Sequence, residues 1–299
     1  MHNAEYLRLV RTPEDRQEHY ARVVDRYYEL VTEVCREVWS DSFHLAWFAE
    51  GQGLREAQRT LQHWLADQGG FTAGDSLLDV GCGIGGPAAA IARHTGARVT
   101  GVNICGHQVE VARSMHRRSE VGRRLRFVEA DAMALPFARA EFDGVFSIEA
   151  LCYAPDKRHA YAQIARVLRP GGGFVGADWF CADGLSPADH ARWVEPMCQG
   201  FAIPHVLPFG ELEEHLEAAG FEVESVSRYD DHGDIAPNWQ GRGPQPDRAV
   251  GGEPPAWAAD GFESLLAGSM PALREGIEQG KVVMGCWVAR RRSTHGGRA

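Results

Sequence analysis

A glycine-rich turn, set between a strand-like run and a helix-like run, constrains this chain most. The stretch Leu77-Leu78-Asp79-Val80-Gly81-Cys82-Gly83-Ile84-Gly85-Gly86-Pro87 passes from apolar residues to glycines, and the small residues 88–92 that follow are typical of a helix. Glycine is needed where the backbone bends sharply or lets a ligand come close. The order strand, tight turn, helix predicts a crevice at the carboxyl end of the strand, where doubly wound folds bind ligands.

The spacing of the glycines limits the class of ligand that the turn could bind. It is G-x-G-x-G-G, not the G-x-G-x-x-G of a dinucleotide site. Asp79 lies two positions before the first glycine, where a carboxylate would repel a pyrophosphate and suits a cationic or amine-bearing ligand. Any sharp strand-to-helix turn needs glycine, so the turn alone indicates a ligand only weakly.

Length and charge set the broad class. The 299 residues fit one large domain or somewhat more, and their ordinary apolar share allows a full core. The net charge of −10 argues against a nucleic-acid surface, which would present a basic face. The seven cysteines are scattered without a C-x-x-C pair, so we expect reduced, packed thiols and a cytoplasmic protein. We find no apolar run near the roughly 20 residues of a membrane span, and residues 1–14 do not resemble a secretory signal.

From residue 74 the sequence alternates between strand and helix patterns. This alternation predicts an α/β fold, with a parallel sheet and helices on both faces. The expected strands are 76–80, 97–102, 125–129, 142–148, 174–178, 221–229 and 281–290. The expected helices in this part are 87–94, 106–118, 158–168, 210–219 and 261–278.

The remaining segments are expected to cover the sheet. Apolar residues at three- and four-residue steps predict a helix over 14–39, and a second helix runs from 54 to about 69. The aromatic stretch 39–48 between them lacks helical spacing and is expected to be a loop that either lines a pocket or anchors the chain. We divide the chain into an N-terminal helical cap (1–70), a Rossmann-like core (71–180), a lid insertion (181–208) and a C-terminal part of the core (209–299). The last part includes a long loop at 230–256 and a basic tail, 290–299, that we expect to be disordered.

Polar residues stand at the predicted carboxyl ends of the second and third strands. Asn103 can hydrogen-bond a ribose hydroxyl without bringing a charge. Asp131 can accept from an exocyclic amine, while the N–H of Ala132 meets a ring nitrogen. Each residue alone is typical of a turn, but together with Asp79 and Gly81 they indicate one ligand site at this edge of the sheet.

Several motifs together resemble those of the class I S-adenosylmethionine-dependent methyltransferases. They are the glycine-rich turn, Asp131-Ala132, Phe142-Asp143 and Val167-Leu168-Arg169-Pro170-Gly171-Gly172, and they span residues 74–180. The resemblance implies a seven-stranded, mostly parallel sheet with one late antiparallel strand, and an enzyme that uses S-adenosylmethionine and releases S-adenosylhomocysteine. We predict that the cofactor is bound by Asp79, Gly81, Cys82, Gly83, Asn103, Ile104, Gln108, Asp131, Ala132 and Ser147.

A narrower resemblance covers about residues 20–180. The segment Ser147-Ile148-Glu149-Ala150-Leu151-Cys152-Tyr153-Ala154-Pro155-Asp156 is similar to one that follows strand four in the sterol C-methyltransferases. Matches also occur at Gly85-Gly86-Pro87, at Gly101-Val102-Asn103 and along the run from Tyr27-Tyr28 to Ser42-Phe43-His44. Bacterial relatives of that group methylate terpenes, prenyl diphosphates and prenylated natural products at an alkene carbon. Tyr153 replaces the group's histidine, Trp39-Ser40-Asp41 replaces its Trp-Gly pair, and residues 181–275 match poorly, which leaves the acceptor open.

The resemblance implies C-methylation of an isoprenoid alkene, in bacterial natural-product biosynthesis, through a carbocation that loses a proton or first cyclises. Such chemistry needs a dry, aromatic-lined pocket and a base beside the cation. Glu149, at the tip of the fourth strand, is our predicted base, with binding of the cofactor or a backbone group as its alternative role, and His44 is a candidate proton relay. The predicted substrate-facing wall consists of Tyr27, Tyr28, Trp47, Tyr153, Trp179 and Phe201.

Two other functions fit part of the same pattern. An O- or N-methyltransferase of a small natural product would need a base near a hydroxyl or amine, for which His44, His159 or His205 is available. A cofactor-binding module without catalysis is disfavoured by the intact turn with Glu149 and Asp131 both present.

The charge of the acceptor stays open at this stage. A diphosphate would call for clustered Arg or Lys, with a divalent metal as an option. Lys157, Arg158 and Arg192 are available but form no basic cluster, and the sequence suggests no metal ligands. We expect a hydrophobic isoprenoid partner, no nucleic acid and no membrane span, with the aromatic N-terminal helix as a candidate for exchange between subunits of a homo-oligomer.

Overall fold

The computed structural model describes residue 1, residues 3–240 and residues 262–293, and it is built on one seven-stranded sheet. The strand order is β3-β2-β1-β4-β5-β7-β6, and only β7 runs antiparallel to its neighbours. The strands are β1 (Ser76–Val80), β2 (Arg98–Asn103), β3 (Leu125–Glu129), β4 (Phe142–Ile148), β5 (Leu168–Cys181), β6 (Phe221–Arg228) and β7 (Val282–Arg291). The predicted mostly parallel sheet with one late antiparallel strand is confirmed.

Helices cover both faces of this sheet, as the alternating pattern predicts. One apolar core joins the sheet to α4 (Leu54–Gly69), α5 (Gly86–Thr95) and α6 (Gly106–His116), whose inward residues include Leu61, Ile91 and Val109. The other core joins it to α7 (Lys157–Val167) and α10 (Leu212–Ala218), with Ile164 and Leu216 buried. The short helical turns are η1 (Gly122–Arg124), η2 (Ala132–Ala134), η3 (Leu151–Tyr153), η5 (Phe209–Glu211), η6 (Tyr229–Asp231) and η7 (Ala236–Asn238).

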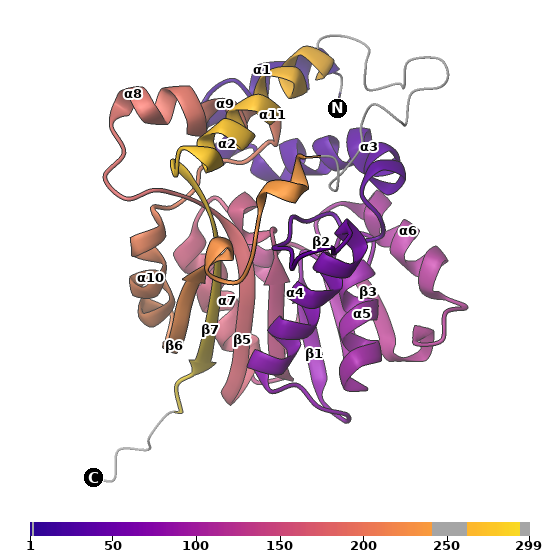
Figure 1. Cartoon of the computed structure of the whole chain (residues 1–299). Coiled ribbons are helices and arrows are strands. Elements are labelled where there is room, and N and C mark those ends of the chain that lie inside the picture. The colour runs from indigo at the N-terminus through magenta and orange to yellow at the C-terminus, as the bar shows by residue number, and fades with distance from the viewer. Residues whose placement is uncertain (2, 241–261, 294–299) are drawn as a thin grey trace.

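A third group of helices lies across the carboxyl ends of the parallel strands (Figure 1). It comprises α1 (Asn3–Leu9), α2 (Pro13–Glu18), α3 (Tyr20–Val38), α8 (Pro187–Asp189), the π-helical turn η4 (His190–Val194), α9 (Glu195–Gly200) and α11 (Phe262–Glu278). Segments from both ends of the chain and from the insertion therefore meet above the sheet edge that the glycine turn occupies.

The N-terminal helix differs from the single helix predicted over 14–39. His19 leaves the helical region with φ −113°, so the chain forms two helices, and Thr12 caps the first by accepting from the Asp15 N–H. The short helix α1 is an additional element, held by burial of Tyr6 and Leu9 against α3. A seven-residue helix is stabilised more by tertiary packing than by local propensity. The sequence pattern alone therefore does not predict it.

A buried arginine ties these N-terminal helices to the insertion. Arg16 is fully buried, and its guanidinium donates to both carboxylate oxygens of Glu195 at 3.0 and 2.9 Å. It also donates to the carbonyls of Ile203 (2.8 Å) and Val10 (2.7 Å). These partners compensate for the cost of burying the Arg16 cation.

Other boundaries shift from the predicted ones. β5 begins at Leu168 and extends to Cys181, well beyond the predicted 174–178, because it pairs along its length with β4 and β7. The start of the predicted loop 230–256 is ordered by η6 and η7, while residues 241–256 lie outside the described residues. Arg290, predicted as the last residue of the final strand, lies in β7 as expected, and Arg291, assigned only to the disordered tail, also belongs to β7. Residues 294–299 lie outside the described residues.

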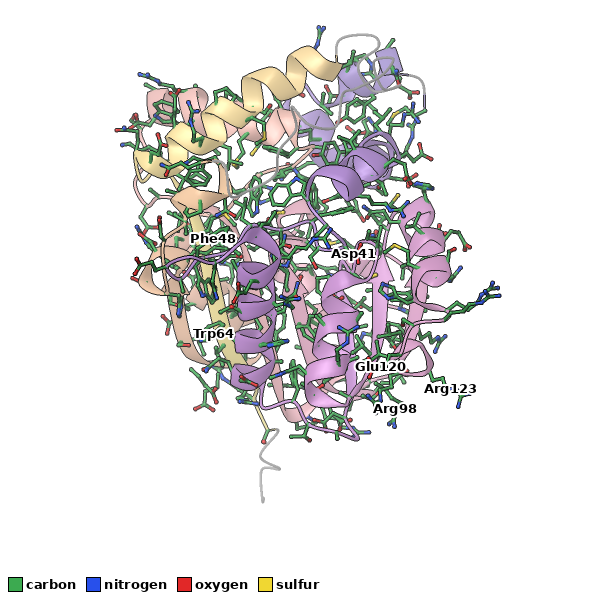
Figure 2. All side chains as sticks on the ribbon, turned by 45° about the vertical axis from the view of Figure 1, so that its right-hand side comes forward. Asp41, Phe48, Trp64, Arg98, Glu120 and Arg123 are labelled. Carbon is green, nitrogen blue, oxygen red and sulfur yellow. The ribbon has the colours of Figure 1, made fainter. Side chains whose placement is uncertain are left out.

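The two ends of the sheet differ in chemistry. Figure 2 places Asp41 and Phe48 near the carboxyl ends of the strands, whereas Arg98, Glu120 and Arg123 project at the opposite end.

Within the described ranges, no helix has the length and apolar character needed to cross a membrane.

Candidate active site

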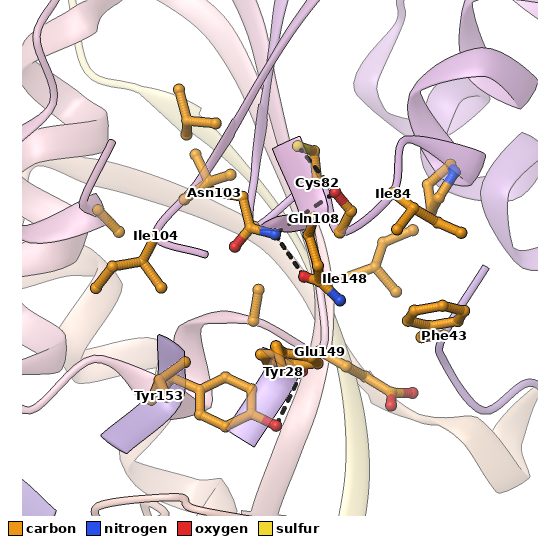
Figure 3. Close-up of a pocket in the computed structure, with 18 of the residues that line it drawn as sticks. Tyr28, Phe43, Cys82, Ile84, Asn103, Ile104, Gln108, Ile148, Glu149 and Tyr153 are labelled. Carbon is orange, nitrogen blue, oxygen red and sulfur yellow. Dashed lines mark hydrogen bonds between the residues drawn. The ribbon is translucent and has the colours of Figure 1, made fainter. Parts of the chain in front are cut away.

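A cavity opens at the carboxyl ends of β1, β2 and β4, beneath α3. It brings together twelve of the residues predicted for the site. They are His44, Gly81, Cys82, Gly83, Asn103, Ile104, Gln108, Asp131, Ala132, Glu149, Tyr28 and Tyr153. The strand ends supply the floor and α3 supplies a roof, as the close-up shows for Tyr28 (Figure 3).

The glycine turn forms one wall and leaves its backbone open. The N–H groups of Gly81 and Cys82 both donate to the Val102 carbonyl at 2.9 Å, which fixes the turn to the end of β2. Gly81, Gly83 and Gly85 have φ of +84°, +52° and +85°, a region that side chains disfavour. A Cβ at Gly83 would meet no atom within 4 Å, so this part of the backbone can be approached by a ligand.

Asp79 lies just beneath this wall and carries an unused acceptor. The residue is 2% exposed, and its Oδ2 has no hydrogen-bond partner within the described part of the chain. Burial raises the pKa of the Asp79 carboxyl well above its usual value. A buried acceptor of this kind is stabilised by a cationic donor, which fits the ammonium group of an amino-acid-bearing cofactor.

Asn103 is oriented by a chain of side-chain hydrogen bonds that reaches the roof. Its Nδ2 donates to Gln108 Oε1 at 2.6 Å, and Gln108 Nε2 donates to Thr32 Oγ1 on α3 at 3.1 Å. The Asn103 Oδ1 takes no part in this chain, so the amide is held with its acceptor available for a hydroxyl (Figure 3).

Asp131 receives a hydroxyl from the roof. The Tyr20 hydroxyl donates to Asp131 Oδ2, and the Met133 N–H donates to Oδ1 at 2.8 Å. Tyr20 also lines the cavity, and burial raises the pKa of its hydroxyl. The carboxylate predicted to meet an exocyclic amine is therefore engaged by α3 in this structure. The remaining predicted cofactor residue, Ser147, is fully buried and donates to the Val80 carbonyl at 2.8 Å, which joins β4 to β1.

Glu149 sits at the tip of β4 in a strained backbone conformation. Its φ is +49°, which a residue with a side chain adopts only when its surroundings enforce it. Its Oε1 accepts from the Leu45 N–H at 2.8 Å and from the Tyr229 hydroxyl at 3.4 Å. Burial raises the pKa of the Glu149 carboxyl to about 8, although the Leu45 N–H and the Tyr229 hydroxyl favour its charged form. The carboxylate reaches the side of the cavity where Phe43 lies (Figure 3).

The segment that carries Leu45 is held by two glutamines of α4. Gln58 Nε2 donates to the carbonyls of Ser42 and His44, each at 2.8 Å. Gln62 Nε2 donates to His44 Nε2 at 2.9 Å, while His44 Nδ1 donates to the Leu45 carbonyl at 2.7 Å. This pattern assigns a neutral imidazole, and burial lowers the pKa of His44 to about 4. His44 thus lines the cavity with both ring nitrogens engaged by protein groups.

Two tyrosines meet across the cavity. The Tyr28 hydroxyl donates to the Tyr153 hydroxyl at 3.0 Å, and their ring centroids are 5.6 Å apart in an edge-on arrangement (Figure 3). Tyr27 packs edge-on against Tyr28 but belongs to the apolar cluster of α1 and α3. Tandem tyrosines thus face different surroundings, one lining the cavity and the other the cap.

Besides Tyr27, three other predicted wall residues do not line this cavity. Trp47 is buried between Trp64, Tyr229 and a stacked His232, so it anchors residues 39–48 to the end of β6. Trp179 and Phe201 pack edge-on against each other at 5.2 Å, both half-buried beside the main core.

The sequence analysis left several lining residues unassigned. Asp41 and Phe43 belong to the aromatic stretch for which pocket lining was one interpretation, and Tyr20 was seen only as part of an apolar stripe. Their signal is weak because loop geometry, not periodicity, points them inward. The others are backbone or apolar neighbours of predicted residues, namely Val24, Val80, Ile84, Pro87, Val102, Ala130, Ile148, Ala150 and Ala154.

The basic residues considered for a diphosphate lie elsewhere. Lys157 is buried against backbone carbonyls, Arg158 pairs with Glu214 at 2.9 Å on the surface, and Arg192 stacks on Trp193. Among the residues that the structure describes, no three or more His, Cys, Asp or Glu side chains are grouped to hold a metal ion.

The sheet order and the open glycine turn agree with the resemblance to the class I S-adenosylmethionine-dependent methyltransferases. Over residues 78–176 the chain matches a family model for a methyltransferase domain. These findings support a methyltransferase domain of that class, whose cofactor is S-adenosylmethionine.

Among curated proteins, the chain is similar to the cycloartenol-C-24-methyltransferase of Arabidopsis thaliana, with 39% identity over 212 residues. That match covers 70% of this chain and 63% of the plant protein. The sterol 24-C-methyltransferase of Pneumocystis carinii is 35% identical over the same length, and 56% of it is covered. The chain thus spans less than two thirds of the length of these relatives.

Among solved structures, the geranyl diphosphate C-methyltransferase of Streptomyces coelicolor, in complex with Mg²⁺, geranyl diphosphate and S-adenosyl-L-homocysteine, has a TM-score of 0.69 and 17% identity. The match covers 91% of this chain and 98% of that one. At this identity the likeness establishes the fold alone.

Proposed function

We propose that this protein transfers a methyl group from S-adenosylmethionine to an alkene carbon of an isoprenoid, and that Glu149 removes the proton from the resulting carbocation. The observation that carries the proposal is the Glu149 carboxylate, held at the tip of β4 in a buried, partly aromatic cavity beside the glycine turn. The similarity to sterol C-methyltransferases supports the reaction type.

The residues present fit the cofactor. Asp79 would hold its ammonium, the turn at Gly81–Gly83 its amino-acid backbone, and Asn103 and Asp131 its ribose and base. When bound, the cofactor supplies an electrophilic methyl group. The chain's part is to hold the alkene at near-attack distance and to keep water out, since a carbocation is trapped by water. Tyr28 and Tyr153 offer ring faces or edges that stabilise positive charge.

Glu149 suits the second step, in which the cation loses a proton. The alkene carbon forms a bond to the methyl carbon as the methyl–sulfur bond breaks, with S-adenosylhomocysteine as the leaving group. The neighbouring carbon becomes cationic, and a C–H bond beside it then breaks to restore a double bond. The proton goes to a Glu149 oxygen. A pKa of about 8 makes this carboxylate a stronger base than an exposed glutamate.

Carbon methylation is favoured over methylation at oxygen or nitrogen. The alternative needs a histidine base at the acceptor, and of His44, His159 and His205 only His44 lines the cavity. Both nitrogens of His44 are engaged, and its low pKa makes it a weak base. A base that takes a proton from a carbocation needs far less strength than one that activates a hydroxyl.

An acceptor without a diphosphate fits this cavity best. The ionisable residues among its described lining are Asp41, Asp131 and Glu149, and none is a lysine or arginine that could pair with a diphosphate. Ionised carboxylates attract a sulfonium and a carbocation but repel a phosphate. We therefore propose a neutral prenyl chain, carried by a terpene, a sterol or a prenylated natural product, as the acceptor.

We also propose a cytoplasmic location, because the seven free thiols suit a reducing compartment.

The proposal is tested by incubating the protein with S-adenosylmethionine and a panel of sterols, farnesol, prenylated indoles and prenyl diphosphates. We expect a mass gain of one methylene on a neutral acceptor, and an NMR spectrum with the new methyl bonded to carbon. The same spectrum identifies any cyclisation. A methyl group found on oxygen or nitrogen would overturn the assignment. The Glu149→Gln variant, matched in cofactor binding, is the control.

A further inference from the structure

Lys157 occupies a position that suits no ordinary lysine. It is one of only two lysines among the 31 Lys and Arg residues, and it is 5% exposed. It is also the first residue of α7, where the helix dipole disfavours a cation. A chain that uses arginine almost everywhere else has therefore placed a lysine in a buried and electrostatically unfavourable position.

The ammonium of Lys157 donates to three backbone carbonyls. Nζ lies 2.7 Å from the Cys152 carbonyl, 2.6 Å from that of Ala154 and 3.0 Å from that of His205. Three convergent acceptors match the three donors of an ammonium, whereas a planar guanidinium cannot direct its N–H groups in this way. All of the hydrogen-bonding capacity of the buried cation is used on the backbone.

The carbonyls belong to two segments that meet at the active site. Cys152 and Ala154 follow directly on Glu149, and this stretch also carries Tyr153. Its other side is held by Asp178, whose Oδ2 accepts from the Cys152 N–H at 2.9 Å. Cys152 is thus hydrogen-bonded to two buried ionisable side chains: its carbonyl accepts from Lys157 and its N–H donates to Asp178.

The third carbonyl belongs to the insertion that covers the sheet edge. His205 lies in residues 203–207, which are bound to β5 through the Cys181 N–H and the Leu207 carbonyl, 2.9 Å apart. Further along, Arg16 holds the Ile203 carbonyl. The Lys157 ammonium therefore joins the base-bearing segment to the insertion without touching the cavity, whose described lining does not include it.

We propose that Lys157 is a positioning residue that fixes segment 149–154 against residues 203–207, so that Glu149 and Tyr153 are placed for proton removal. The proposal rests on the proposed role of Glu149. Burial lowers the pKa of Lys157 to about 8, so its ammonium form at neutral pH depends on these carbonyls and on the charge of Asp178.

The test compares Lys157→Met, which keeps the stem and removes the ammonium, with Lys157→Arg, which keeps the charge in the wrong shape. Lys281→Met is the matched control, since this other lysine pairs with Asp189 on the surface. For each variant we would measure hydrogen exchange by mass spectrometry, affinity for S-adenosylhomocysteine, and kcat and KM with the best acceptor of the panel.

We expect Lys157→Met to exchange faster in peptides covering 149–154 and 203–207 while other core peptides stay protected. Its kcat should fall at least about 10-fold, with S-adenosylhomocysteine affinity within about twofold of the wild type. Lys157→Arg should not restore kcat, and Lys281→Met should behave as the wild type. If Lys157→Met does not fold, Lys157→Gln, which keeps one or two of the three hydrogen bonds, is measured instead.

Two results would overturn the proposal: unchanged exchange in both segments, or loss of protection and cofactor binding throughout the molecule. The first leaves Lys157 without a positioning role, and the second makes it a global stabiliser. The exchange and affinity measurements need no acceptor, so they decide the role of Lys157 even if the proposed reaction is wrong. A kcat that falls without any change in local exchange also contradicts it.

Discussion

The backbone N–H of Leu45 donates to Glu149 Oε1 at 2.8 Å, so the loop 39–48 directly fixes the predicted base. These two residues are 104 positions apart in the sequence, and this direct hydrogen bond joins them. The loop in turn depends on Gln58 and Gln62 of α4. The placement of the base is thus a property of the N-terminal part as much as of β4.

Glu149→Gln should lower turnover by at least about 100-fold, the usual contribution of general base catalysis. The amide keeps the size of the side chain but cannot take the proton. Calorimetry with S-adenosylhomocysteine should give an affinity close to that of the wild type, which separates catalysis from binding. A Gln variant with full activity would remove Glu149 from the mechanism.

The rate should rise with pH up to about 8 and then level off. Because burial raises the pKa of Glu149 to about 8, the carboxyl is mostly protonated at neutral pH and gains basicity as it ionises. Because of the same shift, the folded state binds a proton that the unfolded state has already released. The free energy of unfolding of the wild type should therefore fall as the pH rises from about 4.5 to 8. Glu149→Gln should lose this fall in thermal unfolding curves. A rate profile that is already flat at pH 6 would contradict the shift.

Cofactor binding should be accompanied by proton release. Burial raises the pKa of the Asp79 carboxyl, whose Oδ2 has no hydrogen-bond partner in the described part of the chain, and an arriving ammonium favours its ionised form. Titration calorimetry with S-adenosylhomocysteine in phosphate and in Tris buffers measures this release. Asp79→Asn should lose it and bind about 10- to 100-fold more weakly, as expected for a hydrogen bond between charged groups. Equal heats in both buffers for the wild type would argue against this partner for Asp79.

Tyr20→Phe should bind S-adenosylhomocysteine about fivefold more tightly. The Tyr20 hydroxyl occupies Asp131 in this structure, and a net hydrogen bond is worth about 1 kcal/mol, which the ligand must displace. Asp131→Ala should weaken binding. Unchanged affinity in both variants would show that Asp131 is not part of the cofactor site.

His44→Ala should destabilise the fold by about 1–3 kcal/mol, because Gln62 loses its buried acceptor. His63→Ala on the same helix, where His63 stacks on His94, serves as the control and should cost less than about 0.5 kcal/mol. Burial lowers the pKa of His44 to about 4, so the wild type should lose stability as pH falls from about 6.5 to 4, and the Ala variant should lose less. Urea unfolding at pH 4.5 and 7.5 measures both effects.

Much of the fold could be predicted because its signals are local. The turn at Gly81–Gly85 and the alternation after residue 74 depend on neighbouring residues only, and the strands lie close to where the pattern predicts them. The helix α1 and the length of β5 could not be predicted, since α1 depends on burial against α3 and β5 on pairing with β4 and β7.

The site shows the same division. Residues at strand ends, such as Asn103 and Asp131, face the cavity because the topology of a parallel sheet puts them there. The aromatic residues were harder to assign, because side chains in loops point where tertiary contacts direct them. Trp47 anchors the loop and Phe43 lines the cavity, although they are only four residues apart. The roles of Lys157 and Tyr20 could not be predicted, because they depend on His205 and Asp131, which are distant in sequence.

The contact between Gly81 and Ala150 limits how such an enzyme can be re-engineered. A Cβ at Gly81 would lie 2.0 Å from the Cβ of Ala150, so the glycine turn and the segment that follows Glu149 share one space with no room for another methyl group. Grafting an acceptor segment from a relative would therefore succeed only with a side chain no larger than alanine at position 150. Directed evolution toward new acceptors is then better aimed at residues 39–48, of which Asp41, Phe43 and His44 line the cavity.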